Sequence, residues 1–142
     1  MQIVGRILAV YLVLTALAAA VLLIVTPLTH DGSPDYPVWS VLNWFMAVGV
    51  VAILVISFLR KRALGDRDGG SDLEAARVSL VYYGAIVLTM LFFWEWFWTL
   101  NPESETGEAV TSHIVYFPLM DSLFVVLGLS IGRRIWRKAG GA

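Results

Sequence analysis

The chain contains no cysteine among its 142 residues. This absence excludes a thiol–disulfide enzyme, an iron–sulfur cluster held by cysteine and covalent attachment of a c-type haem. Charged residues are also scarce, at 15% of the chain, whereas hydrophobic residues make up 58% and the mean hydropathy is +0.76. This composition is far from that of a soluble domain and indicates a membrane protein.

The hydrophobic residues gather in four long stretches, at 7–26, 38–59, 78–100 and 114–136. Each stretch is close to the roughly 20 residues that cross a hydrocarbon layer of about 30 Å as a helix. The short connections leave no room for a separate soluble domain. We therefore predict an all-α fold in which residues 1–142 form one domain, an integral membrane four-helix bundle with both termini on the same side.

Every basic residue falls on one side of these predicted spans, namely Arg6, Arg60, Lys61, Arg62, Arg67, Arg77, Arg133, Arg134, Arg137 and Lys138. The positive-inside rule therefore predicts that both termini and the connection between the second and third spans are cytoplasmic. The outer side or outer half of the membrane then holds Asp31, Asp35, Glu95, Glu103, Glu105, Glu108 and Asp121, with both histidines, His30 and His113. We expect a multi-pass protein of a bacterial cytoplasmic (inner) membrane. Its basic residues face lipid headgroups, so we expect no nucleic-acid binding.

The residues around the spans predict where the helices begin and end. The apolar run after Arg6 continues past the alanines at 18–20 to Thr26, which favours an uncleaved first helix over a secretory signal. Pro27 opens a segment rich in proline and glycine, which predicts that the helix breaks there and that a turn of about ten residues follows. Ser71 and Glu74 have capping-box spacing, so the third helix is expected to begin near Asp72.

Pro118 leaves two interpretations of the fourth helix. The helix either starts near Phe117, with 110–116 as an interfacial segment, or starts at Ser112 and is kinked near Pro118. Proline suits the first turn of a helix and disrupts its interior. The second interpretation is favoured because Ser112 is a plausible cap and the first leaves a shorter span.

Three ionisable residues, Glu95, His113 and Asp121, are predicted to lie within or beside the outer half of the bundle. An ionisable group inside a membrane span is by default a functional hypothesis, because burying it without a partner is costly. Two roles are open: a proton relay in which Glu95 and Asp121 share a proton, and a metal site that adds His113. The structural alternative is that each carboxylate accepts hydrogen bonds from neighbouring polar side chains.

Aromatic residues crowd the outer ends of the second and third spans. The tryptophans there are Trp39, Trp44, Trp94, Trp96 and Trp98. An interfacial aromatic belt explains most of them, because indole favours the headgroup level. Aromatic residues all round the third helix also suggest contact with other protein subunits.

Small residues at helical spacing predict close helix packing. Gly128 and Gly132 form a GxxxG pair in the fourth span, and Ala16 with Ala20 repeats the spacing in the first. The segment 128–132 also matches a hydrolase nucleophile elbow, but that motif requires a strand before a helix. A haem held by His30 and His113 has little support, because buried haem takes its ligands inside a bundle.

Taken together, these features favour an accessory subunit without catalytic activity or cofactor of its own, bound to other integral membrane subunits and to lipids. Respiratory and oxygenase-type oxidoreductases are the expected hosts, by general analogy. The acidic outer connection with Glu103, Glu105 and Glu108 could dock a cationic partner such as a soluble c-type cytochrome. Two alternatives stay open: a small proton- or ion-coupled transporter using Glu95 and Asp121, and a membrane enzyme with an outer-leaflet metal at Glu95, His113 and Asp121.

Overall fold

The computed structural model describes residues 2–29, 37–65, 71–101 and 108–140, apart from the side chains at 108–114. This part of the chain is helical and comprises α1 (Gln2–Thr29), α2 (Pro37–Gly65), α3 (Asp72–Thr99) and α4 (Glu108–Gly140). All four helices contain a segment long and apolar enough to cross a membrane. The described residues therefore form an all-helical fold of four helices that could each span a membrane.

The end of α1 differs from the sequence prediction, because Pro27 lies inside the helix instead of breaking it. Proline lacks the N–H that would bond the carbonyl four residues earlier, but α1 ends two residues later, so little of the helix depends on that bond. The hydroxyls of Thr26 and Thr29 donate to the carbonyls of Leu22, at 2.6 Å, and Val25, at 3.1 Å. Both hydroxyls therefore bond the carbonyl four residues earlier in their own helix, as serine and threonine commonly do inside helices.

The beginning of α3 is the one predicted from the capping-box spacing. Ser71 has extended backbone angles, and its hydroxyl oxygen accepts a hydrogen bond from the Glu74 N–H at 3.3 Å. An N-cap of this kind satisfies one of the free amides at a helix start. The predicted start near Asp72 is therefore confirmed.

The fourth helix begins at Glu108 and continues through Pro118. The interpretation in which it starts near Phe117 is therefore wrong, and the helix also begins earlier than the alternative start at Ser112. Proline in a helix removes one N–H and crowds the carbonyl four residues before it. α4 has ten helical residues before Pro118, so the hydrogen bond lost at the proline does not end the helix.

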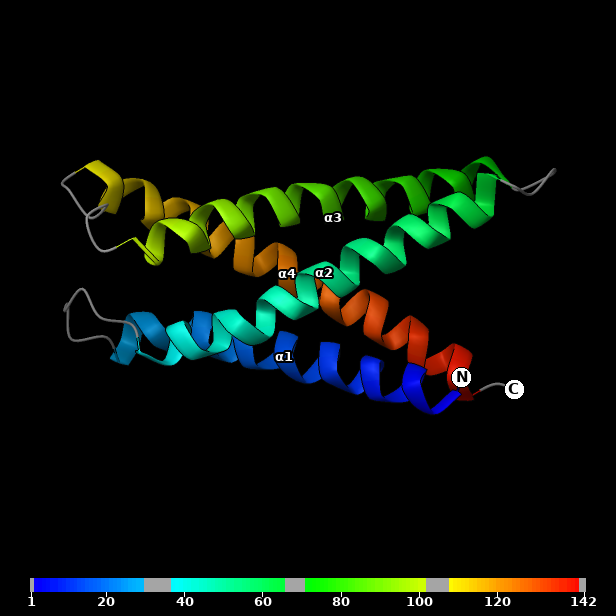
Figure 1. The fold of residues 1–142 in the computed structure, drawn as a ribbon, viewed down its shortest axis with the longest axis horizontal. Helices are drawn as coiled ribbons and strands as arrows, with labels where there is room; N and C mark the ends of the chain where they lie inside the picture. Colours follow the sequence, from blue (N-terminus) through cyan, green and yellow to red (C-terminus); the bar gives the residue numbers. More distant parts are fainter. Residues whose placement is uncertain (1, 30–36, 66–70, 102–107, 141–142) are drawn as a thin grey trace.

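The helices are arranged so that α2 and α4 cross in the middle of the bundle, between α1 and α3 (Figure 1). The end that holds both chain termini is called the basic end, because it carries Arg6, the end of α2 and the end of α4. The other end, where α1 and α3 finish, is called the distal end. The most extensive contact joins α1 to α4, and the next joins α2 to α3, whereas α1 and α3 do not touch within the described residues.

The crossing of α2 over α4 depends on Gly49. A Cβ atom at this position would lie 3.0 Å from two ring carbons of Phe124, closer than nearly all real contacts of this kind. Phe124 itself is fully buried. The missing side chain therefore lets the ring of α4 lie directly against the backbone of α2.

The contact between α1 and α4 depends on Gly128 and Gly132. A Cβ atom at Gly128 would lie 3.1 Å from the Cβ of Ala16, and one at Gly132 would lie 2.8 Å from Cγ2 of Val13 and 3.2 Å from the carbonyl oxygen of Ala9. Ala20 is half-buried further along α1. The two glycines therefore allow the helix backbones to approach closely, as small residues do in membrane bundles.

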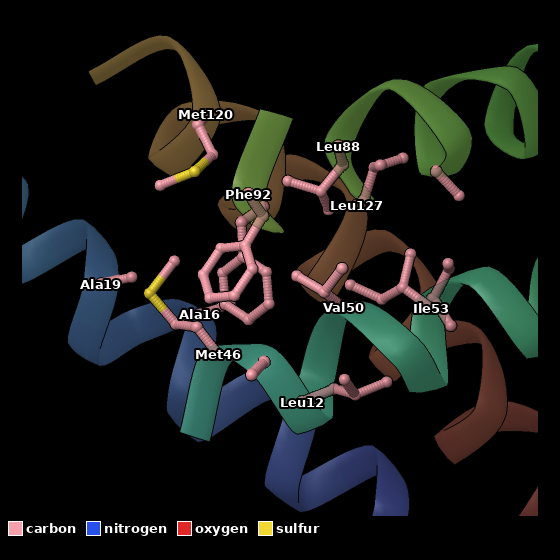
Figure 2. Packing of buried hydrophobic residues seen from close by; sticks show 14 of the residues in the cluster. Leu12, Ala16, Ala19, Met46, Val50, Ile53, Leu88, Phe92, Met120 and Leu127 are labelled. Carbon is pink, nitrogen blue, oxygen red and sulfur yellow. The ribbon is translucent and has the colours of Figure 1, made fainter. Parts of the chain in front are cut away.

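The core around these contacts is built from all four helices. Figure 2 shows side chains of α1, α2, α3 and α4 meeting around the rings near Met46 and Phe92. Its labelled members are Leu12, Ala16, Ala19, Met46, Val50, Ile53, Leu88, Phe92, Met120 and Leu127. Lipid tails are as apolar as these side chains, so in a bilayer the bundle is held by close packing more than by exclusion of water.

We predict that Gly132→Ala lowers the free energy of unfolding in detergent by about 1–3 kcal/mol, the usual penalty of overpacking. The added methyl would press on Val13 and on the Ala9 carbonyl. Gly84→Ala is the matched control, because a Cβ there meets only Leu127 at 3.8 Å, an ordinary contact. Thermal unfolding of both variants tests this. Equal unfolding midpoints would show that α1 and α4 can separate without loss.

Candidate functional site

Glu95 and Asp121 are both buried inside the distal half of the bundle, with 4% and 2% of their surfaces exposed. Glu95 lies on α3 next to the buried Trp96, and Asp121 lies on α4 next to the buried Met120. Burying a carboxyl group away from water costs free energy unless hydrogen bonds or opposite charges compensate. The fold therefore buries two carboxyl groups, each at a cost in folding free energy.

The two carboxyl groups differ in how their oxygens are satisfied. Oδ1 of Asp121 is buried and has no hydrogen-bond partner among the described residues. Glu95, in contrast, takes part in an interaction with another group. A buried acceptor without a partner is rare in proteins and is typical of sites kept for a function. Asp121 is therefore the stronger candidate of the two.

The register of α3 against α4 determines how far apart the carboxyl groups lie. The rings of Trp94 and Tyr116 are 6.4 Å apart, and Gly84 lies beside Leu127. Because the helices run antiparallel, these contacts place Asp121 opposite residues near Met90. That level is about five or six residues, or about 8–9 Å, nearer the basic end than Glu95.

Side chains on a helix lean toward its N-terminus. Glu95 on α3 therefore leans toward the basic end, and Asp121 on α4 leans toward the distal end, so the two carboxyl groups lean toward each other. The carboxyl groups therefore lie closer together than the axial offset of their backbones.

Several predicted site residues fall outside the described part of the structure. The backbone at His113 belongs to α4, but its imidazole is not described, and His30, Glu103 and Glu105 lie in segments that are not described. Glu108 is the first residue of α4, again without a described side chain. Among the side chains that are described, no three of the metal-binding types gather closely enough to hold an ion.

The tryptophans of the predicted belt occupy three different settings. Trp96 is buried in the core and meets the ring of Trp44 edge-on at 4.7 Å. Trp39 is half-buried, and its indole N–H donates to the hydroxyl of Thr26 at 2.8 Å, which ties α2 to α1. Trp44, Trp94 and Trp98 are exposed. Two of the five tryptophans therefore stabilise the bundle itself.

Exposed aromatic side chains of α2, α3 and α4 lie toward the distal end. Five of them are called here the aromatic surface: Trp44, Trp94, Phe97, Trp98 and Tyr116. Ring contacts join Trp44 to Phe97 through the buried Trp96, and a separate ring contact joins Trp94 to Tyr116. An open hollow of about 230 Å³ lies between Trp94, Phe97, Trp98 and Asn101. This volume is below that of ordinary small-molecule sites and suits a single side chain.

Sequence reasoning missed two buried polar residues on α2, Asn43 and Ser57, which are 6% and 2% exposed. Both lie on the buried face of α2 that also carries Met46, Val50 and Ile53. The signal was present in the sequence, because all five positions recur at spacings of three or four residues, which place them on one helix face.

Neither a protein-family model, nor a curated protein, nor a solved structure shows significant similarity to this chain. Its function must therefore be argued from the residues described above.

We predict that Asp121→Asn raises the free energy of unfolding in detergent by about 1 kcal/mol or more, because an ionisable group whose Oδ1 lacks a partner is replaced by one of the same shape that cannot become charged. Ser122→Ala, at the exposed neighbouring position, serves as the control and should leave the unfolding midpoint unchanged. A loss of stability in Asp121→Asn would instead show that the carboxylate has a stabilising partner outside the described residues.

Proposed function

We propose that this chain is an integral membrane protein with both termini in the cytoplasm, and that it acts as an accessory, non-catalytic subunit that stabilises a larger inner-membrane complex. The observation that carries this proposal is the aromatic surface. The orientation is supported by the basic end, where all the basic residues of the described segments lie. Under the positive-inside rule that end faces the cytoplasm.

The aromatic surface is one-sided, which separates it from an ordinary lipid-facing belt. A belt that served only the lipid interface would be needed on every helix that faces lipid. The exposed large side chains toward the distal end of α1 are instead aliphatic: Leu14, Leu17, Val21, Ile24, Val25 and Leu28. Aromatic residues around a small hollow are typical of the centre of a protein interface, where they supply most of the binding energy.

The host complex is proposed by analogy as a respiratory or oxygenase-type oxidoreductase, whose cores often carry small helical subunits. In the proposed orientation the acidic connection with Glu103 and Glu105 lies on the outer side, where it would attract a cationic partner such as a soluble c-type cytochrome. The accessory role depends neither on the identity of the host complex nor on a cationic partner.

We predict that a triple variant, Trp94→Leu with Phe97→Leu and Trp98→Leu, separates the chain from its host complex. The exposed positions become aliphatic, so the bundle keeps an apolar surface but loses its aromatic contacts. The matched control replaces Leu14, Leu17 and Val21 on the exposed face of α1 with alanine. Tagged proteins are isolated from the native membrane in mild detergent and compared on native gels.

The wild type and the α1 control should migrate with a stoichiometric set of larger subunits, whereas the triple variant should migrate alone with an unchanged unfolding midpoint. Migration of the wild type as a lone monomer or homodimer would contradict the accessory role. Retention of the larger subunits by the triple variant would contradict the assignment of the interface.

A second candidate function is a small proton- or ion-coupled transporter, and the buried Asp121 favours it. Its unpartnered Oδ1 lies inside the distal half of the bundle, as an ion-coupling carboxyl would. The metal-enzyme alternative depends on the side chain of His113, which is not described, and no observation favours it.

The transporter candidate predicts that the purified protein in liposomes speeds the decay of an imposed pH gradient, read by a pH-sensitive dye trapped inside. Asp121→Asn should reduce this flux to that of protein-free liposomes, because no group would then carry the proton. Ser122→Ala should behave as the wild type. A wild-type flux equal to that of protein-free liposomes removes this candidate.

A further inference from the structure

Three charged residues from three helices lie near one another where the core ends at the basic end of the bundle. They are Arg60 of α2, Glu74 of α3 and Arg134 of α4, and Arg60 lies close enough to the other two to feel their charges. Arg60 and Arg134 are both half-buried, and Glu74 is exposed. Taken by themselves, these three described residues carry a net charge of +1.

Two hydrogen-bond donors beside this cluster lack partners. The hydroxyl of Ser57 and Nε of Arg60 are both buried, and neither has a hydrogen-bond partner among the described residues. Ser57 is 2% exposed and lies three residues before Arg60, which places the two side chains on the same face of α2. Arginine Nε can only donate, and the serine hydroxyl can donate or accept. A single hydrogen-bond acceptor could therefore take a bond from each of these two groups.

Other basic residues at the same end already have partners in the protein. The ammonium group of Lys61 donates to the hydroxyl of Tyr83 at 2.9 Å and lies over the rings of Tyr82 and Tyr83. The guanidinium of Arg6 donates to the carbonyl of Ala139 at 3.1 Å. Among the described residues, the buried side-chain donors without a hydrogen-bond partner are those of Ser57 and Arg60.

The depth of the site matches the level of lipid headgroups. Arg60 lies five residues before the end of α2, and Arg134 six residues before the end of α4, or about 8–9 Å along each axis. Helices of 29 and 33 residues are longer than the roughly 20 residues that cross the hydrocarbon layer, so their ends project into the headgroup region.

We propose that Ser57, Arg60 and Arg134 bind the phosphate of an anionic phospholipid. A phosphate diester carries one negative charge, which matches the charge left by Arg60, Arg134 and Glu74, and its oxygens accept the unpaired donors. Planar guanidinium groups bind phosphate oxygens through two parallel hydrogen bonds. Basic sites between helices at the cytoplasmic side are typical for anionic headgroups. The inference rests on membrane insertion and not on the accessory role.

The test is native mass spectrometry of the delipidated protein, titrated with phosphatidylglycerol, phosphatidylcholine or inorganic phosphate. We expect one tightly bound phosphatidylglycerol per chain. Arg60→Gln and Arg134→Gln should each weaken its binding about tenfold or more, and Ser57→Ala several-fold, because each removes a hydrogen bond to a charged group. Arg62→Gln and Arg133→Gln remove the same charge from exposed positions on the same two helices, and should bind as the wild type.

Equal weakening in all four arginine variants would overturn the site, because it would show diffuse attraction to the whole basic end. Equal binding of phosphatidylcholine, or full displacement of phosphatidylglycerol by an equimolar amount of inorganic phosphate, would overturn the lipid as ligand. If Arg60→Gln does not fold, thermal unfolding of the wild type decides the question. Protection by phosphatidylglycerol that saturates at one lipid per chain and is absent with phosphatidylcholine supports the proposal, and equal protection by both overturns it.

Discussion

The close approach of α4 to two other backbones is the constraint on which the rest of this bundle depends. Gly49 admits the ring of Phe124 where α2 and α4 cross, while Gly128 and Gly132 bring α4 against α1. In lipid such close contacts, together with hydrogen bonds between helices, hold the bundle, because apolar side chains gain little there by leaving the solvent. The crossing in turn sets the register that separates Glu95 from Asp121 and brings Arg60 close to Arg134.

The packed middle of the bundle divides its buried polar groups into two sets with opposite character. The distal half holds carboxyl groups, and the basic end holds guanidinium groups and a serine hydroxyl. Between them the buried face of α2 carries only Met46, Ala47, Gly49, Val50 and Ile53. Apolar side chains therefore separate the two sets, and each set has its own expected ligand. The carboxyl groups would bind a proton or a cation, and the guanidinium groups with the serine hydroxyl would bind an anion.

Much of the fold could be predicted from the sequence because its signals are strong and local. Four apolar stretches of spanning length predict four helices, and the capping residues at Ser71 and Glu74 predict where α3 begins. Pro27 and Pro118 misled the prediction of helix ends, because a single missing hydrogen bond is outweighed by the many that the rest of a long helix retains. The helices extend beyond the predicted spans at most of their ends.

The candidate site was only partly predictable, because burial depends on which helix faces which. The sequence identifies Glu95 and Asp121 as charges inside spans, but their offset follows from the α3 and α4 register, which no local pattern encodes. Asn43, Gly49 and Ser57 escaped notice for the same reason: an uncharged polar residue or a glycine in an apolar helix becomes informative only once its neighbours are known.

The pairing of α1 with α4 has a consequence for how the protein is made. The first helix to be synthesised finds its main partner only when the last one is complete, since α1 contacts α4 far more than α2 and does not touch α3. In an inserted chain, α1 therefore stays without its main partner while α2, α3 and α4 are translated, with only its smaller contact to α2 to cover it. The most apolar segment of α1 has a mean hydropathy of 2.9, the highest of the four helices, so α1 is stable in lipid before its main partner is made. The corresponding value for α4 is 1.7, and α4 enters a bilayer that already contains α1.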